Sequence, residues 1–133
     1  MSFPSDDRPA RPEVAPFAAW LGLYNESAAN GRAVVCFTPR AEMLNRQGVV
    51  HGGVLASLLD SAMARASRTL EGVTELGGTT DLHVHFMRPA IGPLRALAWI
   101  DLAGGTLAFC RAEVRNATAE LVATGSASMR LRR

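Results

Sequence analysis

Residues 45–61 constrain this chain more than any other stretch, because they read as a polar loop that runs into a long helix. The loop ends in His51-Gly52-Gly53, and a carboxylate, Asp60, follows about two helical turns later. Glycines at a helix start allow close approach to the backbone, and the first helical N–H groups lack intrahelical partners. We therefore expect Gly52 and Gly53 to present donors to a ligand carbonyl, with Asp60 acting on its carbon from the side.

The helix is predicted from about Gly53 to Glu71, since apolar residues recur in one stripe at 100° per residue. Asp60 falls roughly 145° from the centre of that stripe, so it is predicted to face away from the core of its own subunit. The same outer face is expected to carry the small side chains Ser57, Ala64 and Ser67, with Ser61 at its edge. The simple alternative is a solvated Asp60 on an ordinary amphipathic helix.

The rest of the chain predicts an antiparallel sheet of about six strands, and hence the α+β class. Two strands meet at an Asn-Gly turn before the helix, and four follow it as a meander. One helix covers only one face of such a sheet, so we expect a homodimer or homotetramer. Residues 1–13 are expected to form a flexible tail and 14–133 a single domain. The expected strands are Leu23–Ser27, Arg32–Thr38, Thr79–Arg88, Leu94–Leu102, Thr106–Arg115 and Glu120–Leu131.

Charge and composition exclude several classes of function. All 14 basic residues are arginine, which removes Schiff-base chemistry and a P-loop lysine. A net charge of +2 and 6% aromatic residues disfavour a nucleic-acid partner. No apolar run is long enough for a membrane span, and the N-terminus does not resemble a signal peptide. Cys36 and Cys110 are expected to be free thiols in the cytoplasm, with a single disulfide as the alternative.

A metal site is considered at Asp81, His83 and His85, which alternate along one expected strand. A further ligand from elsewhere would be required, so we predict no metal and a hydrogen-bonded histidine pair at a subunit interface. The nucleophile elbow of serine hydrolases, the dinucleotide fingerprint and Cys-x-x-Cys are all absent from the sequence.

The run Asn45-x-x-Gly48-x-x-His51-Gly52-Gly53, followed by Asp60-Ser61, resembles the hot-dog-fold acyl-CoA thioesterases of the phenylacetate-degradation type. The resemblance extends from about Pro16 to Met129 and includes the Phe-x-Arg-Pro pattern at 86–89. It implies a long central helix wrapped by an antiparallel sheet, and hydrolysis of an acyl- or aryl-CoA thioester. It implies no cofactor, because CoA is part of the substrate. A non-catalytic acyl-CoA or lipid-binding module and a hot-dog enoyl-CoA hydratase are the alternatives.

The resemblance also implies roles for individual residues. Asp60 matches the catalytic carboxylate, either nucleophile or general base, and the N–H of Gly52 matches the group that polarises the thioester carbonyl. Asn45 and His51 match residues that orient the substrate and the attacking water. Where many relatives carry a basic residue after the hairpin glycine, this chain has Thr106. The remaining substrate-binding positions implied are Gly53, Ser61, Thr79, Arg88, Pro89, Gly104, Gly105 and Thr106.

Overall fold

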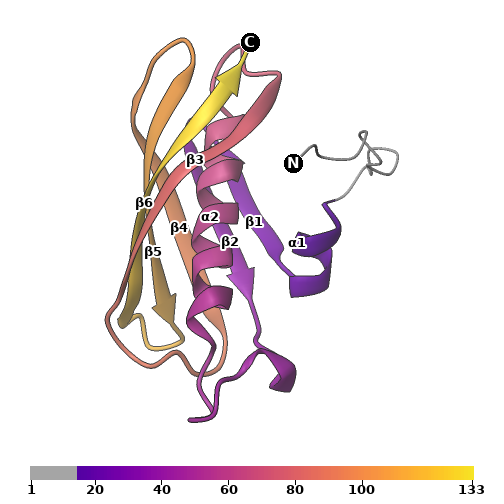
Figure 1. The fold of residues 1–133 in the computed structure, drawn as a ribbon, viewed down its shortest axis with the longest axis vertical. Helices are drawn as coiled ribbons and strands as arrows, with labels where there is room; N and C mark the ends of the chain where they lie inside the picture. The colour runs from indigo at the N-terminus through magenta and orange to yellow at the C-terminus, as the bar shows by residue number, and fades with distance from the viewer. Residues whose placement is uncertain (1–14) are drawn as a thin grey trace, which may run out of the picture.

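A six-stranded antiparallel sheet curves around one long helix in the computed structural model, which describes residues 15–133 (Figure 1). The strand order is β1-β2-β4-β5-β6-β3. This arrangement confirms the predicted α+β hot-dog fold. The predicted tail at 1–13 lies outside the described residues. In chain order the elements are α1 (Pro16–Leu21), β1 (Tyr24–Ala29), β2 (Arg32–Phe37), the 3-10 helix η1 (Ala41–Met43), α2 (Gly52–Arg68), β3 (Glu75–Phe86), β4 (Leu94–Ala103), β5 (Leu107–Asn116) and β6 (Leu121–Arg132).

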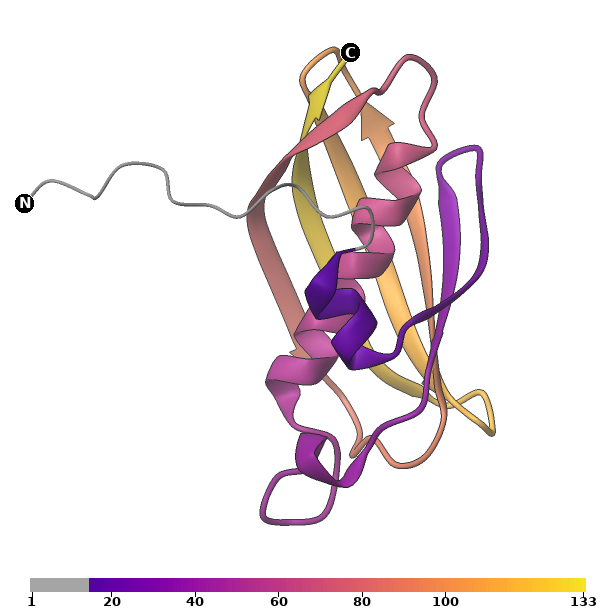
Figure 2. The ribbon, with the colours of Figure 1, turned by 90° about the vertical axis from the view of Figure 1, so that its right-hand side faces the viewer.

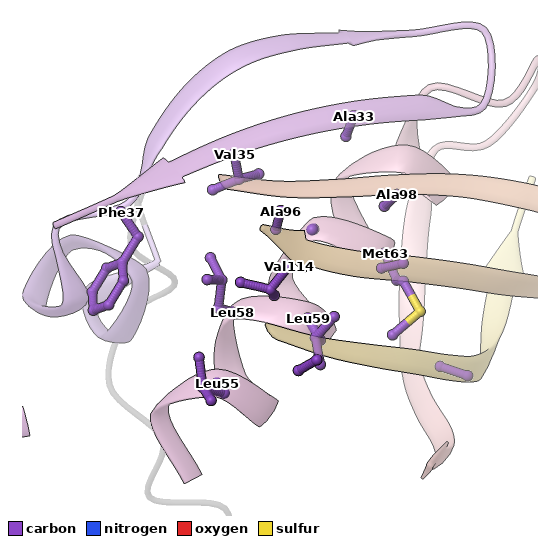
Figure 3. Close-up of a cluster of buried hydrophobic side chains, with 14 of the residues drawn as sticks. Ala33, Val35, Phe37, Leu55, Leu58, Leu59, Met63, Ala96, Ala98 and Val114 are labelled. Carbon is purple, nitrogen blue, oxygen red and sulfur yellow. The ribbon is translucent and has the colours of Figure 1, made fainter. Parts of the chain in front are cut away.

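The core forms where the apolar stripe of α2 meets the concave face of the sheet (Figure 3). Leu55, Leu58, Leu59 and Met63 of α2 are buried against strand residues that are mostly small. These partners include Val35, Ala96, Ala98 and Val114. Alanines on β4 let the helix approach the sheet closely, and each buried leucine contributes about 1.5–3 kcal/mol. The stripe thus fixes which face of α2 remains available for function.

Two element boundaries differ by three or more residues from those predicted. The helix ends at Arg68 rather than Glu71, because the Thr69 hydroxyl donates to the Ala66 carbonyl and accepts the Gly31 N–H, each at 2.7 Å. Strand β3 begins at Glu75, four residues before the predicted start at Thr79. The Gly-Gly pair at 77–78 lies in the strand, where the pairing with β6 shifts register.

The predicted outer position of Ser67 is wrong. Ser67 is fully buried, with its hydroxyl donating to the Met63 carbonyl at 2.9 Å and lying 3.3 Å from the Cys110 sulfur. Because the sheet curves around α2, the buried arc of the helix is wider than its apolar stripe. Cys36 and Cys110 are both free.

Strand β3 forms one edge of the sheet and pairs only with β6 among the described residues. The predicted meander of four strands after the helix is therefore wrong, because only β4, β5 and β6 follow one another in the sheet. It leaves apolar side chains uncovered: Leu82 is 38% exposed and Phe86 is 57% exposed, and Met87 beyond the strand is also exposed. An unpaired apolar strand edge is a surface on which another chain can pair. Within residues 15–133, the structure contains no helix with the length and hydropathy of a membrane span.

Candidate active site

His51, one of the predicted site residues, is the N-cap of α2. Its Nδ1 accepts a hydrogen bond from the Gly53 N–H at 2.9 Å, and its carbonyl accepts from Val54. The Gly53 donor predicted to serve a ligand is therefore already used. Within residues 15–133 the N–H of Gly52 makes no hydrogen bond, so it remains available as a donor.

The two glycines leave space for side chains of this chain. A Cβ on Gly52 would lie 3.2 Å from Cζ of Phe86, and a Cβ on Gly53 would lie 3.0 Å from Nδ1 of His51. Both contacts are tighter than ordinary van der Waals separations. The expectation that the missing Cβ atoms admit a ligand is thus corrected: Phe86 and the capping imidazole occupy that space.

Asn45 organises the loop that precedes α2. Its Oδ1 accepts hydrogen bonds from the Gln47 N–H at 2.9 Å and, at 3.4 Å, from the Val49 N–H. The loop is also fixed at its end, since the Val50 N–H donates to the Ala90 carbonyl and the His51 N–H to the Met43 carbonyl. Asn45 therefore has a structural role that the sequence did not indicate, and its predicted contact with substrate or water stays a prediction.

Asp60 lies on the outer face of α2, as predicted, and is half-buried. The hydroxyl of Thr79 on β3 donates to Asp60 Oδ1 at 2.7 Å. The same hydroxyl lies 3.3 Å from the Met129 sulfur, a far weaker acceptor than a carboxylate. Thr79 therefore orients the carboxylate, and this contact between the helix and the edge strand could not be read from the sequence.

A trough runs over the outer face of α2, between α1 and β3, and encloses a cavity of about 290 Å³. In Figure 2 α1 lies on the viewer's side of α2, and residues of both helices line the trough. Arg40 holds α1 in place, stacking 4.9 Å from the Trp20 ring centroid. The trough is lined by Ala15, Ala18, Asp60, Ser61, Ala64, Arg65, Arg68, Leu76, Gly78, Thr79 and Met129.

Gly52 and Asp60 of one chain are too far apart to act on one carbonyl group. They are eight residues apart in one helix, which places them about 12 Å apart along its axis. Within one chain, Gly52 and Asp60 therefore do not meet the same ligand carbonyl, and their action on one carbonyl stays a prediction. A site that uses both groups requires Gly52 from one copy and Asp60 from another.

The remaining predicted binding residues lie at opposite ends of the molecule (Figures 1 and 2). Arg88 and Pro89 follow β3 and are exposed near the start of α2, where Arg88 donates to the Leu121 carbonyl at 2.7 Å. The β4–β5 hairpin lies at the far end, and the guanidinium of Arg133 contacts its backbone carbonyls and that of Glu71. One chain therefore does not bring these two groups of residues together. The hairpin residues concerned are Gly104, Gly105 and Thr106.

Comparison with known proteins identifies the family. The family model described as Thioesterase superfamily matches residues 47–123, more than half of the chain, including the start of α2, Asp60 and Thr79. The chain belongs to the thioesterase superfamily.

Solved structures of similar proteins support the assignment to the thioesterase superfamily. The PaaI protein of the Escherichia coli phenylacetic acid degradation operon is 29% identical, with a TM-score of 0.81 over 88% of this chain and 84% of its own. The phenylacetic acid degradation protein PaaI of Thermus thermophilus is 31% identical, with a TM-score of 0.79 over 87% and 98%. The conserved protein PA5202 of Pseudomonas aeruginosa is 30% identical, with a TM-score of 0.83 over 90% and 95%.

Arg65 and Arg68 are site residues of this thioesterase-superfamily chain that the sequence interpretation missed. Both line the trough beside Asp60. Burial, followed by the charge of Arg68, lowers the pKa of the Arg65 guanidinium below its ordinary value. At 100° per residue, Arg65 and Arg68 fall about 140° and 80° round the helix from Asp60, so their spacing gave no signal that they line the same trough.

His83 and His85 lie away from the trough. Their Nε2 atoms are 3.1 Å apart, so the predicted hydrogen-bonded histidine pair is present, and its place at a subunit interface stays a prediction. They line a second cavity of about 400 Å³ over β4, β5 and β6. Asp81 instead accepts a hydrogen bond from the Ser128 N–H at 3.1 Å.

Proposed function

We propose that this protein is an acyl-CoA thioesterase that hydrolyses an acyl- or aryl-CoA thioester to the free carboxylic acid and CoA. The observation that carries the proposal is the Asp60 carboxylate, held by Thr79 in an open trough on the outer face of the family's central helix. Membership of the thioesterase superfamily supports the same reaction class. The reaction requires water and no cofactor.

The active site is shared between two copies of the chain. The separation of about 12 Å between Gly52 and Asp60 along one helix supports this arrangement, as does the exposed apolar edge of β3. In a homodimer, or a homotetramer built from two such dimers, the free N–H of Gly52 from one copy would meet Asp60 of the other. Substrate and a second copy of the chain are the expected partners.

The chemistry follows from where charge develops. As the thioester carbonyl is attacked, negative charge builds on its oxygen, and a fixed backbone N–H such as that of Gly52 stabilises it. Asp60 either attacks the carbonyl carbon or removes a proton from the attacking water. In the first case the C–S bond breaks to leave an acyl anhydride on Asp60, and water then hydrolyses this anhydride to the free acid, regenerates the carboxylate and supplies the proton of the thiol. In the second case the C–S bond breaks as the proton that Asp60 took from water passes to the leaving sulfur. The hydrogen bond from Thr79 holds the Asp60 carboxylate in one orientation throughout the reaction.

The CoA part of the substrate would lie along exposed segments of the chain outside the trough. Arg88 and Pro89 lie near the start of α2, and Gly104–Thr106 lie at the opposite end, so the two segments would come from different copies. Arg88 is exposed and suits a phosphate. The free thiols of Cys36 and Cys110 support a cytoplasmic location.

The test is thiol release from a panel of CoA esters, with phenylacetyl-CoA included because two relatives are named for phenylacetic acid degradation. Short, medium, long and aryl acyl groups should be covered, with an enzyme-only blank to subtract protein thiols. Turnover that Asp60→Asn abolishes supports the proposal. Binding of the esters without thiol release by the parent would instead assign a non-catalytic binding module. Hydration of an enoyl-CoA would assign the hydratase.

A further inference from the structure

Phe86 packs against the residue that is proposed to bind the thioester carbonyl. Its ring atom Cζ lies 3.2 Å from the position that a Cβ on Gly52 would take. The nitrogen and Cβ of one residue are about 2.5 Å apart by standard bond lengths, so Cζ lies within about 6 Å of the Gly52 nitrogen. An acyl chain that starts from a carbonyl held by this N–H, at about 2.9 Å, therefore needs only a few carbon–carbon bonds to reach the ring.

The Phe86 ring is largely uncovered although its tip meets Gly52. The residue is 57% exposed, so most of its surface is not covered by residues 15–133 of its own chain. The Gly52 N–H beside it makes no hydrogen bond within the same residues. An apolar surface next to an unused donor is typical of small-molecule sites, in which a few polar groups orient a mainly apolar ligand.

Other exposed apolar side chains lie around the start of α2. Met87 follows Phe86 and is 54% exposed, Ile91 is 67% exposed and Leu44 is 39% exposed. Leu44 bridges to Val50, and the Val50 N–H donates to the carbonyl of the residue before Ile91, so both segments adjoin the helix start. The surroundings of the Gly52 donor therefore favour an apolar group.

We propose that Phe86 contacts the acyl group of the substrate and sets a preference for apolar acyl groups, aryl groups above all. This inference rests on the proposed thioesterase function, in which the Gly52 N–H binds the thioester carbonyl. An aryl group would stack on the ring or meet its edge, which contributes beyond the area that is buried. An alkyl chain would gain only from the apolar surface that it covers.

The pantetheine arm is the other part of the substrate that an exposed ring next to the carbonyl could contact. Its amide groups need hydrogen-bond partners, which Phe86 and its apolar neighbours do not supply. The acyl group is therefore the better match. Acetyl-CoA and free CoA distinguish the two parts, because both carry the pantetheine arm and lack a large acyl group.

The experiment measures kcat/KM for phenylacetyl-CoA, hexanoyl-CoA and acetyl-CoA with the parent, Phe86→Leu and Phe86→Ala. Phe109→Leu is the matched control, because Phe109 lies on β5 and is 46% exposed. The ratio of each larger ester to acetyl-CoA is compared, since contacts with CoA cancel in it. Calorimetry on Asp60→Asn, with and without Phe86→Ala, compares phenylacetyl-CoA with free CoA and gives a readout independent of turnover. Light scattering and melting curves are recorded for each variant.

We expect the parent to prefer phenylacetyl-CoA over acetyl-CoA, and Phe86→Ala to lower that ratio about three- to tenfold. Phe86→Leu should lower the phenylacetyl ratio and retain most of the hexanoyl ratio, because leucine keeps an apolar surface without a ring. Phe109→Leu should leave both ratios unchanged. Free CoA should bind equally well with and without Phe86→Ala.

Three results would overturn the inference while leaving the thioesterase function intact. Unchanged ratios in Phe86→Ala would place the acyl group elsewhere. An equal loss for all three esters would assign the ring to the pantetheine arm or to support of Gly52. A lowered mass for Phe86→Ala would assign the ring to the contact between copies.

Absence of turnover with every ester would instead refute the proposed function, and calorimetry would then decide the role of Phe86. An equal effect of Phe86→Ala on phenylacetyl-CoA and free CoA would refute the inference as well. Weaker binding of the ester alone would support it.

Discussion

The hydroxyl of Thr79 is expected to determine how well Asp60 is positioned. Thr79→Val removes the donor that lies 2.7 Å from Asp60 Oδ1 and keeps a β-branched side chain suited to a strand. A hydrogen bond to a charged group contributes about 1.5–3 kcal/mol. Because Thr79 is exposed and Asp60 is only half-buried, we expect this hydrogen bond to contribute the lower value of that range. We therefore expect a loss of about 1.5 kcal/mol in transition-state stabilisation, or roughly tenfold in kcat/KM.

Steady-state thiol release on the best CoA ester measures this effect, with a melting curve for each variant. Thr80→Val is the matched control, because the Thr80 hydroxyl donates to the Ser128 carbonyl at 3.2 Å. Thr79→Ser keeps the donor and should retain most of the activity. The reasoning is refuted if Thr79→Val stays within twofold of the parent, or if Thr79→Ser is impaired as strongly as Thr79→Val.

Three further outcomes are expected. Asp60→Asn should lower kcat by about 10²–10⁴-fold with little change in melting temperature, and turnover within a few-fold of the parent would contradict a catalytic role. Light scattering should give a dimer or tetramer mass, and Leu82→Glu at the β3 edge should lower both mass and activity; a fully active monomer would exclude a shared site. Burial raises the pKa of Cys110 above its ordinary value, so the unfolded chain loses its proton first and stability should fall as pH rises through the thiol range. Unfolding curves should show a smaller alkaline loss for Cys110→Ala than for the parent.

The sequence predicted the central helix, the six strands and the outward face of Asp60, because apolar residues recur at regular spacings. It did not predict that β3 pairs with β6 instead of β4, because periodicity does not reveal which strands are neighbours. It did not predict the contact of Asp60 with Thr79, since the pairing of β3 with the helix depends on how the sheet curves. Ser67 was misplaced for the same reason: curvature widens the buried arc beyond what a helical wheel gives.

The site residues were harder to predict than the fold. The capping role of His51 depends on which nitrogen meets the Gly53 N–H, and spacing alone does not reveal it. The position of Gly52 relative to Asp60 follows from helical rise, so the need for two copies at the site was already present in the sequence. Arg65 was overlooked because a long charged side chain on an outer face is ordinarily solvated.

The loop before α2 is held mainly through main-chain atoms, at Val50 with Ala90 and at His51 with Met43. Arg46 and Gln47 at its tip are exposed, and no side-chain hydrogen bond of theirs anchors the loop within residues 15–133. Saturation mutagenesis at these two positions should therefore yield mostly folded variants with the helix start in place. For protein engineering, the tip is a place where the sequence can be varied or extended without moving the start of α2.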